Sequence, residues 1–115
     1  MPDRGQTAPF ASSSAGKGIL VDTTGVSVHS VAPGQHHFLY MWAANSHSGA
    51  VTLTVRMGGT GAADIIEQSI TNQGGLQKVL DGILISNSTG TAIAITAIAT
   101  TTTDKITLFG HWEVA

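Results

Sequence analysis

Short segments of alternating apolar and polar residues, separated by turn-forming residues, make up most of the chain from Gly18 onward. The segment VTLTVRM (51–57) is the clearest, because Val51, Leu53 and Val55 fall on one side of an extended chain. No segment keeps the 3.6-residue period of an amphipathic helix convincingly. About eight or nine strands at this close spacing predict an all-β fold, either an antiparallel β-sandwich of the jelly-roll or Ig-like kind or a barrel, and argue against βαβ units.

Turn signals divide these segments. We expect turns at Thr24-Gly25, Pro33-Gly34, Asp81-Gly82 and Asn87 to Gly90. An Asn-Ser turn before an alternating strand occurs twice, in NSHSGAVTLTV (45–55) and in NSTGTAIAIT (87–96), and indicates two hairpins of similar shape. The segment DIIEQSI (64–70) fits a strand, although its three isoleucines would also share one face of a helix.

The chain has the length of one domain. Residues 1–17 are rich in Ser, Ala, Gly and Pro and have no period, so we expect an N-terminal arm that is either flexible or draped over a partner. Residues 18–115 are expected to form a single β-sandwich domain.

Charge is scarce, and this excludes several partners. Charged residues make up 10% of the chain, against about 25% in typical soluble domains. Five Lys plus Arg against seven Asp plus Glu leave no basic stripe, so we expect no nucleic-acid partner. No apolar run is long enough to cross a bilayer, and the N-terminal sequence lacks the order of a secretory signal, so we expect no membrane partner. A nearly neutral surface rich in Thr, Ser, Gly and Ala indicates a chain that packs against other proteins.

No residue pattern predicts catalysis, a cofactor or a metal. The glycine-rich loop GGTGAAD (58–64) lacks the helix of a phosphate-binding loop. The adjacent His36 and His37 point to opposite faces of a strand, and the other histidines have no ligand spacing. No cysteine is present and no nucleophile motif frames a serine. We therefore expect a protein that is not an enzyme.

The aromatic residues concentrate in one segment, HHFLYMWAAN (36–45). Phe38, Tyr40 and Trp42 alternate and so share one face of the strand. Such a face fills a core or an oligomer interface, or it forms a platform on which sugars stack.

The segment TAIAITAIA (91–99) has no charged face for solvent. Its isoleucines change sides between Ile95 and Ile98, and a β-bulge near Thr96-Ala97 would place Ile98 on the core side with Ile95. The opposite side is then a smooth row of Ala and Thr that suits a protein partner. Together with the arm and the aromatic strand, this gives the candidate interface residues Phe10, Tyr40, Trp42, Ala92, Ala94 and Thr96.

The order of these features over residues 18–115 resembles small jelly-roll structural proteins of tailed bacteriophages, of the head decoration or cement type. The resemblance lies in the Asn-Ser turn within MWAANSHSGAVTLTVRM, the glycine-rich loop, the Ile-rich DIIEQSI and the ending KITLFGHWEVA. It implies a virion component made in the bacterial cytoplasm, a homo-oligomer with a trimer favoured, that binds the major capsid protein of a phage and stabilises the head. The alternative is a carbohydrate-binding module or a sandwich domain associated with a phage tail or fibre. The sequon Asn87-Ser88-Thr89 is interpreted as turn chemistry and not as a glycosylation site.

Overall fold

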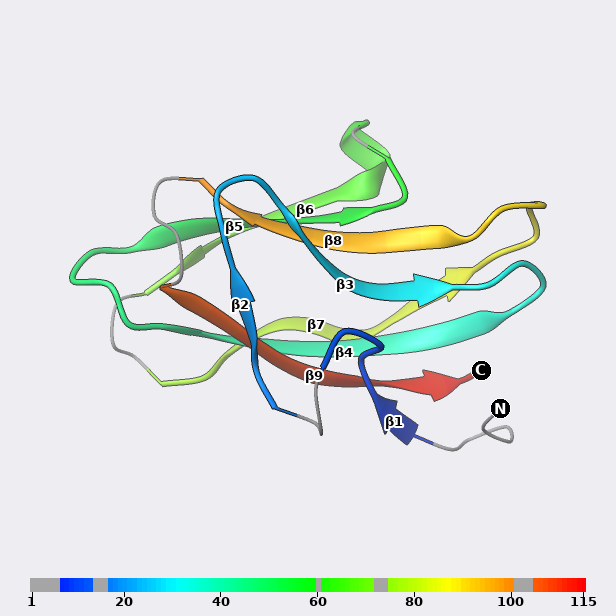
Figure 1. The fold of residues 1–115 in the computed structure, drawn as a ribbon, viewed down its shortest axis with the longest axis horizontal. Helices are drawn as coiled ribbons and strands as arrows, with labels where there is room; N and C mark the ends of the chain where they lie inside the picture. Colours follow the sequence, from blue (N-terminus) through cyan, green and yellow to red (C-terminus); the bar gives the residue numbers. More distant parts are fainter. Residues whose placement is uncertain (1–6, 14–16, 60, 72–74, 101–104) are drawn as a thin grey trace.

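Strands dominate the computed structural model, which describes residues 7–13, 17–59, 61–71, 75–100 and 105–115 (Figure 1). The strands are β1 (Thr7–Pro9), β2 (Ile19–Val21), β3 (Val26–Val31), β4 (His36–Asn45), β5 (Val51–Met57), β6 (Ile65–Ile70), β7 (Gln77–Ser86), β8 (Ile93–Ala99) and β9 (Ile106–Val114). A short 3₁₀ helix, η2 (Ala62–Asp64), precedes β6. Among the described residues the all-β prediction is confirmed, and the helical alternative for DIIEQSI is wrong.

Two antiparallel sheets pack face to face. The first sheet has the order β1-β9-β4-β7, with β2 also paired to β9, and the second has the order β3-β8-β5-β6. Four strand pairs are nested within one another, as in a single long hairpin that is closed by β5 and β6. From the closed end outward they are β5·β6, β4·β7, β3·β8 and β2·β9. Rolling that hairpin brings β4 beside β9 and β5 beside β8. The topology is therefore that of a jelly roll.

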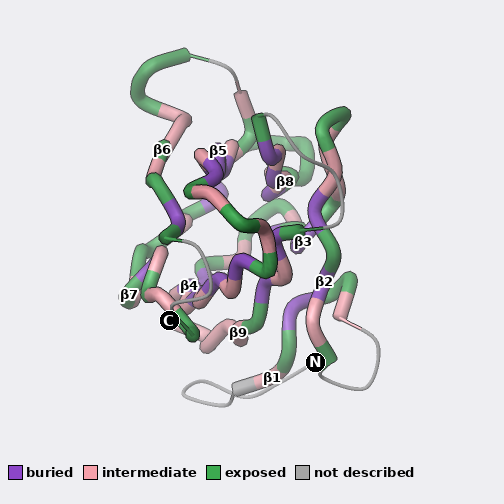
Figure 2. The backbone as a smooth tube through the Cα atoms, turned by 90° about the vertical axis from the view of Figure 1, so that its left-hand side faces the viewer, coloured by how far each residue is buried: buried purple, intermediate pink, exposed green. Residues whose placement is uncertain are grey.

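The core lies between the sheets, where the buried residues of the two sheets face one another (Figure 2). Strand β4 shows the cause most clearly, because its residues alternate strictly between buried and partly exposed from His37 to Asn45. Leu39 and Met41 are fully buried, as are Leu53 and Ile95 of the facing sheet. Alternation along the sequence thus fixes which side of each sheet faces the core.

Strand β8 keeps strict alternation, so the bulge expected near Thr96-Ala97 is wrong. Ile95 and Ala97 are buried, while Ile98 lies on the outer side. The irregularity sits in the partner strand β3, between Ser27 and His29, where Val28 and His29 are both buried. The bulge in β3 leaves the parity of β8 unchanged and turns the His29 side chain into the core.

The turn expected at Asp81-Gly82 is also wrong, because β7 runs without interruption from Gln77 to Ser86. Its register against β4 shifts between Leu39 and Tyr40, opposite this pair. Gly82 has φ +75°, a conformation that glycine adopts at a bulge without steric cost. The pair Asp-Gly, which often closes β-hairpins, thus forms a bulge inside a strand here.

The Pro33-Gly34 turn is confirmed. The Gln35 amide donates to the Ala32 carbonyl at 3.1 Å, and Gly34 has φ +79°. This turn carries the chain from β3 in the second sheet to β4 in the first.

Part of the expected N-terminal arm belongs to the sandwich of its own chain. Residues 7–9 form β1, which pairs with β9 so that Pro9 lies opposite His111. The next residue, Phe10, is buried in the core. The Phe10 ring occupies the space beside Gly110, where a Cβ atom would lie 2.5 Å from Phe10 Cε2. Residues 1–6 and 14–16 of the arm lie outside the described residues.

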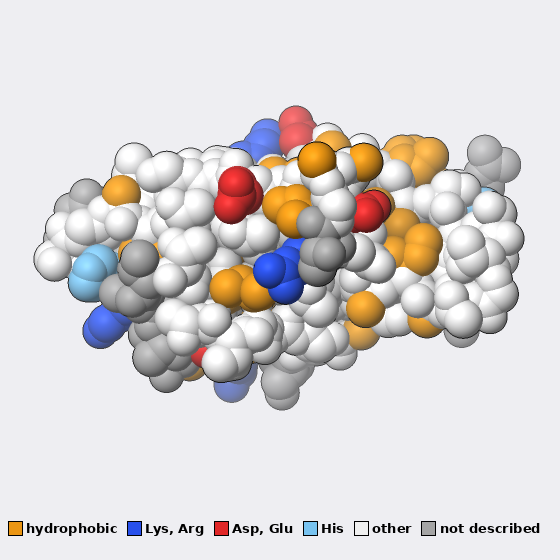
Figure 3. All heavy atoms as spheres, turned by 90° about the horizontal axis from the view of Figure 1, so that it is seen from above, with side chains coloured by type: hydrophobic (Ala, Val, Ile, Leu, Met, Phe, Trp, Pro, Cys, Tyr) orange, Lys and Arg blue, Asp and Glu red, His pale blue; other side chains and the backbone are white. Residues whose placement is uncertain are grey.

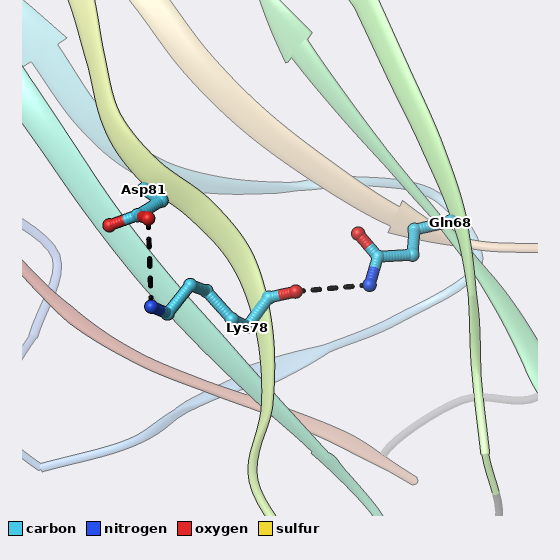
Figure 4. A network of polar contacts seen from close by, with 3 residues as sticks. All are labelled: Gln68, Lys78 and Asp81. Carbon is cyan, nitrogen blue, oxygen red and sulfur yellow. Dashed lines mark hydrogen bonds and ion pairs between the residues drawn. The ribbon is translucent and has the colours of Figure 1, made fainter.

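Glutamine side chains join the two sheets along one edge of the sandwich. Gln68 of β6 donates its amide to the Lys78 carbonyl of β7 at 3.0 Å (Figure 4). Gln77 of β7 reaches back, donating to the Ser69 carbonyl at 3.0 Å and accepting from the Thr71 amide at 3.2 Å. These bonds satisfy edge-strand backbone groups that would otherwise be free to pair with another chain.

Candidate interaction surfaces

The outer side of the first sheet carries an aromatic face, which we define as Phe38, Tyr40 and Trp42 of β4 with Phe109 and His111 of β9. In the β4·β9 register, Tyr40 lies opposite His111 and Trp42 opposite Phe109. The His111 ring stacks on Tyr40 with centroids 4.8 Å apart, and on Trp42 at 6.0 Å. Cross-strand pairing therefore converts the alternation of the sequence into a continuous surface of rings.

This aromatic face is open to solvent in the single chain. Its three β4 side chains are partly exposed, and Phe109 is 37% exposed. Leu84 of β7, opposite Phe38, extends the apolar surface and is 49% exposed. Exposed apolar surface of this kind is common at the interfaces and ligand sites of proteins.

Charged groups border the aromatic face on both sides. On β7, Lys78 and Asp81 form an ion pair at 3.6 Å, opposite Trp42 and Tyr40 (Figure 4). On β9, the Glu113 carboxylate accepts a hydrogen bond from the Tyr40 hydroxyl and thereby raises the pKa of Tyr40. The face therefore offers stacking surfaces with hydrogen-bonding groups at its margin.

The outer side of the second sheet carries a different surface, the Ala/Thr face, which we define as Ala92, Ala94 and Thr96 with Thr54 and Arg56 of β5. Viewed onto this sheet, the molecule shows mostly uncharged atoms with a few scattered charged side chains (Figure 3). A shallow hollow of about 320 Å³ is lined by Arg56, Gly58, Gly59, Ala92, Ala94 and Thr96. Nε of Arg56 is buried there without a hydrogen-bond partner among the described residues.

The six candidate interface residues do not form one surface. Tyr40 and Trp42 lie on the aromatic face, whereas Ala94 and Thr96 lie on the Ala/Thr face at the opposite side of the sandwich. Ala92 is exposed just before β8. Phe10 is 1% exposed and packs inside the core, so it is not part of the outer surface of this chain. The molecule thus has two separate faces on which partners could bind.

A pair of buried histidines was missed by the sequence analysis. His29 of β3 and His37 of β4 are both 3% exposed, and His29 Nε2 lies 3.0 Å from His37 Nδ1. The Trp112 ring stacks on His37 with centroids 4.0 Å apart. A signal was present, because the valines of VSVHSV change parity between Val28 and Val31, which indicates the bulge that turns His29 inward.

Burial shifts the titration of this pair. Desolvation, followed by the charge of His37, lowers the pKa of His29 to about 4. Desolvation and the charge of His36 also lower the pKa of His37. A cavity of about 610 Å³ lies beside the pair, lined in part by Pro9, Phe10, Gln35 and Trp112.

No three histidine, aspartate or glutamate side chains gather to hold a metal ion within the part of the chain that the structure describes. His36 and His37 point to opposite sides of β4, as expected, and His36 instead bonds Ser86 Oγ at 2.6 Å. In that same part of the chain, no helix is long and apolar enough to span a bilayer.

Comparisons with known proteins give little. No family model matches the chain. No curated protein matches it. A solved structure described as "Structure of infectious bursal disease virus Gt strain" aligns with 99% of this chain and 30% of that chain, at 11% identity and a TM-score of 0.38.

Proposed function

We propose that the chain is a non-enzymatic structural protein of a virion, a decoration protein that binds the major capsid protein of a phage head as a homo-oligomer, with a trimer favoured. The observation that carries the proposal is the aromatic face, a row of rings on the outer side of the first sheet that the single chain leaves open. Aromatic residues concentrate in protein interfaces because they bury large areas with few torsions to fix. The aromatic face is assigned to the contact between subunits.

The Ala/Thr face supplies a second, separate surface for the shell. Its small side chains let another backbone approach closely, and the Arg56 guanidinium lies in the hollow between them. An acidic side chain of a capsid protein suits that position, because guanidinium and carboxylate form strong paired hydrogen bonds. One such contact is weak, but three copies in a closed oligomer bind together through avidity.

The low charge of the chain agrees with this role. Charged residues are 10% of the sequence, so neighbouring copies repel one another little. Jelly rolls occur in viral capsid proteins and also in lectins, so the fold admits the proposal without deciding it.

Two measurements test the proposal: the oligomer mass by light scattering, and co-sedimentation with undecorated phage capsids. Trp42→Arg places a charge in the aromatic face and should give monomers. Ala94→Arg alters the Ala/Thr face and should leave the oligomer intact while it stops binding to capsids. Ser88→Arg, at an exposed turn residue that belongs to neither face, serves as the matched control. A wild-type monomer that binds no capsid would overturn the proposal.

A carbohydrate-binding module is the second candidate, and the same aromatic face favours it. Phe38, Tyr40 and Trp42 form a row of rings, and Asp81 and Glu113 lie at its margin to bond sugar hydroxyls. Retardation of the wild-type protein, but not of Trp42→Ala, in gels that contain polysaccharide would support this candidate. If the wild-type protein is a monomer and is retarded in this way, carbohydrate binding becomes the first candidate function and capsid decoration the second.

A further inference from the structure

Residues 7–13 form a strap across one end of the sandwich, and they join both sheets. On the first sheet, β1 pairs with β9 through Ala8 opposite Trp112. On the second sheet, the Ser12 amide donates to the Val28 carbonyl of β3 at 3.1 Å. Between these points Phe10 fills the space beside Gly110. The strap therefore closes the end of the core.

The histidine pair bonds the strap directly. The Ala11 amide donates to His29 Nδ1 at 3.1 Å, so this nitrogen is an acceptor and carries no proton. The proton of His29 is then on Nε2, which donates to His37 Nδ1 at 3.0 Å. His37 keeps its proton on Nε2, 3.0 Å from the Gln35 side-chain oxygen. One arrangement of neutral tautomers satisfies every bond of this chain.

A second proton on either ring breaks this arrangement. On His29 it would bind at Nδ1 and face the Ala11 amide, so that two donors would oppose each other. On His37 it would bind at Nδ1 and face the Nε2 proton of His29. In the first case the strap loses its bond directly, and in the second the bridge between the sheets is lost.

Few groups around the His29–His37 pair stabilise its protonated, positively charged form. The strap carries no ionisable side chain. From β9, the pair is faced by Trp112, while Glu113 bonds Tyr40 on the opposite side of the sheet. His36 adjoins His37, and its charge disfavours protonation. Ala115 lines a small cavity of about 130 Å³ together with His36 and His37.

We propose that the His29–His37 pair is a proton-sensitive lock: it holds the strap while both rings are neutral and releases residues 7–13 when the pair takes up a further proton. Release bares the β9 edge and the space that Phe10 fills, both of which are then open to a strand from another molecule.

The pH window follows from the shifted titration. Release of the strap exposes His29 to water and moves its pKa from about 4 toward the ordinary value of 6.5. The locked form is therefore fully favoured above pH 6.5 and loses its advantage as the pH falls toward 4. Across that interval the released fraction rises about tenfold per pH unit for one histidine.

Hydrogen exchange of the whole chain tests the proposal, corrected for the intrinsic pH dependence of exchange. The amides of Ala11 and Ser12 should lose protection about tenfold per pH unit between pH 6.5 and 4. The core amides of Leu39 and Met41 exchange only by global unfolding and should therefore stay better protected than the strap at every pH. In a Trp42→Phe background the fluorescence of Trp112, stacked on His37, should change in the same pH range.

The variants separate the lock from general acid sensitivity. His29→Gln with His37→Asn keeps polar groups but cannot titrate, so strap protection should become independent of pH. His47→Asn, at a histidine distant from the strap, should retain the wild-type profile. If the double variant does not fold, NMR of the ring nitrogens in the wild type decides, because the tautomers above predict an unprotonated Nδ1 on both rings. Strap protection that is constant from pH 7.5 to 4.5, or a protonated Nδ1 at pH 7.5, would overturn the proposal.

Discussion

Asn87 repeats, at the turn before β8, the hydrogen bonds that Asn45 makes at the turn before β5. Each side-chain oxygen accepts from the amide two residues ahead, at 2.9 Å in both turns. Each side-chain nitrogen donates to the carbonyl four residues ahead and to one distant strand, Ile70 for Asn45 and Val31 for Asn87. The repeated Asn-Ser pattern of the sequence is therefore a repeated structure. Asn87 of the sequon uses its side chain to hold this turn, as the sequence analysis predicted.

Asn45→Ala and Asn87→Ala should each destabilise the fold strongly. Both side chains are buried, and their removal leaves backbone groups without partners, at about 1–3 kcal/mol for each unsatisfied group. Urea unfolding measures the loss. Ser88→Ala, in the same turn but exposed, is the control and should change stability by less than about 0.5 kcal/mol. Equal stability of Asn87→Ala and the control would contradict the structure.

Gly110→Ala should disrupt the packing of the N-terminal strap. An added Cβ would lie 2.1 Å from the Tyr40 carbonyl oxygen and 2.5 Å from Phe10 Cε2, so β4 or the strap must move. Overpacking of this kind costs about 1–3 kcal/mol or more. Gly90→Ala is the matched control, because nothing lies within 4 Å of its Cβ position. Thermal unfolding should show a lower Tm for the first variant alone.

Acid should weaken the whole domain in two successive intervals. The depressed pKa of His29 means that its neutral form stabilises the fold above pH 6.5, and this stability is lost as the pH falls to about 4. The loss is of the order of 3 kcal/mol. The Gly25 amide and the Thr24 hydroxyl lower the pKa of Asp22, so its contribution is present above pH 3.8 and is lost at lower pH. Urea midpoints measured from pH 7.5 to 3 check the order, and His29→Gln should reduce the first interval, to which His37 also contributes, and leave the second unchanged.

Gln77→Ala should open the joined edge of β6 and β7. The variant loses the bonds to Ser69 and Thr71, at about 1 kcal/mol each, and frees backbone groups of an edge strand. We expect modest destabilisation together with faster aggregation, measured by light scattering at matched temperature below Tm. Lys78→Ala, which removes only an exposed ion pair, should aggregate at the wild-type rate.

Alternation predicted the strands and the sandwich, because burial on one side leaves a direct mark on the sequence. The bulge was misplaced because β3 and β8 share one ladder, in which either strand could take the extra residue, although the parity change of the valines in VSVHSV indicates β3. The turn predicted at Asp81-Gly82 was wrong for a related reason. A glycine at positive φ fits a turn or a bulge equally well, and here the long pairing of β7 with β4 makes it a bulge. The separation of Tyr40 from Ala94 onto opposite faces, and the contact of His29 with His37, depend on how the hairpin rolls. A linear pattern does not record that.

Arg56 should contribute to binding and not to folding. Its Nε has no partner among the described residues, so Arg56→Gln removes no visible bond within the chain, and the unfolding free energy should stay within about 0.5 kcal/mol of wild type. If the Ala/Thr face meets an acidic group of the capsid, the lost charged hydrogen bond is worth about 1.5–3 kcal/mol, or a tenfold to hundredfold weaker Kd per site. Lys105→Gln, which removes an exposed cation outside this face, is the control. Co-sedimentation at several salt concentrations should show weaker, less salt-dependent binding for Arg56→Gln alone, and equal binding of both variants would assign the shell contact to another surface.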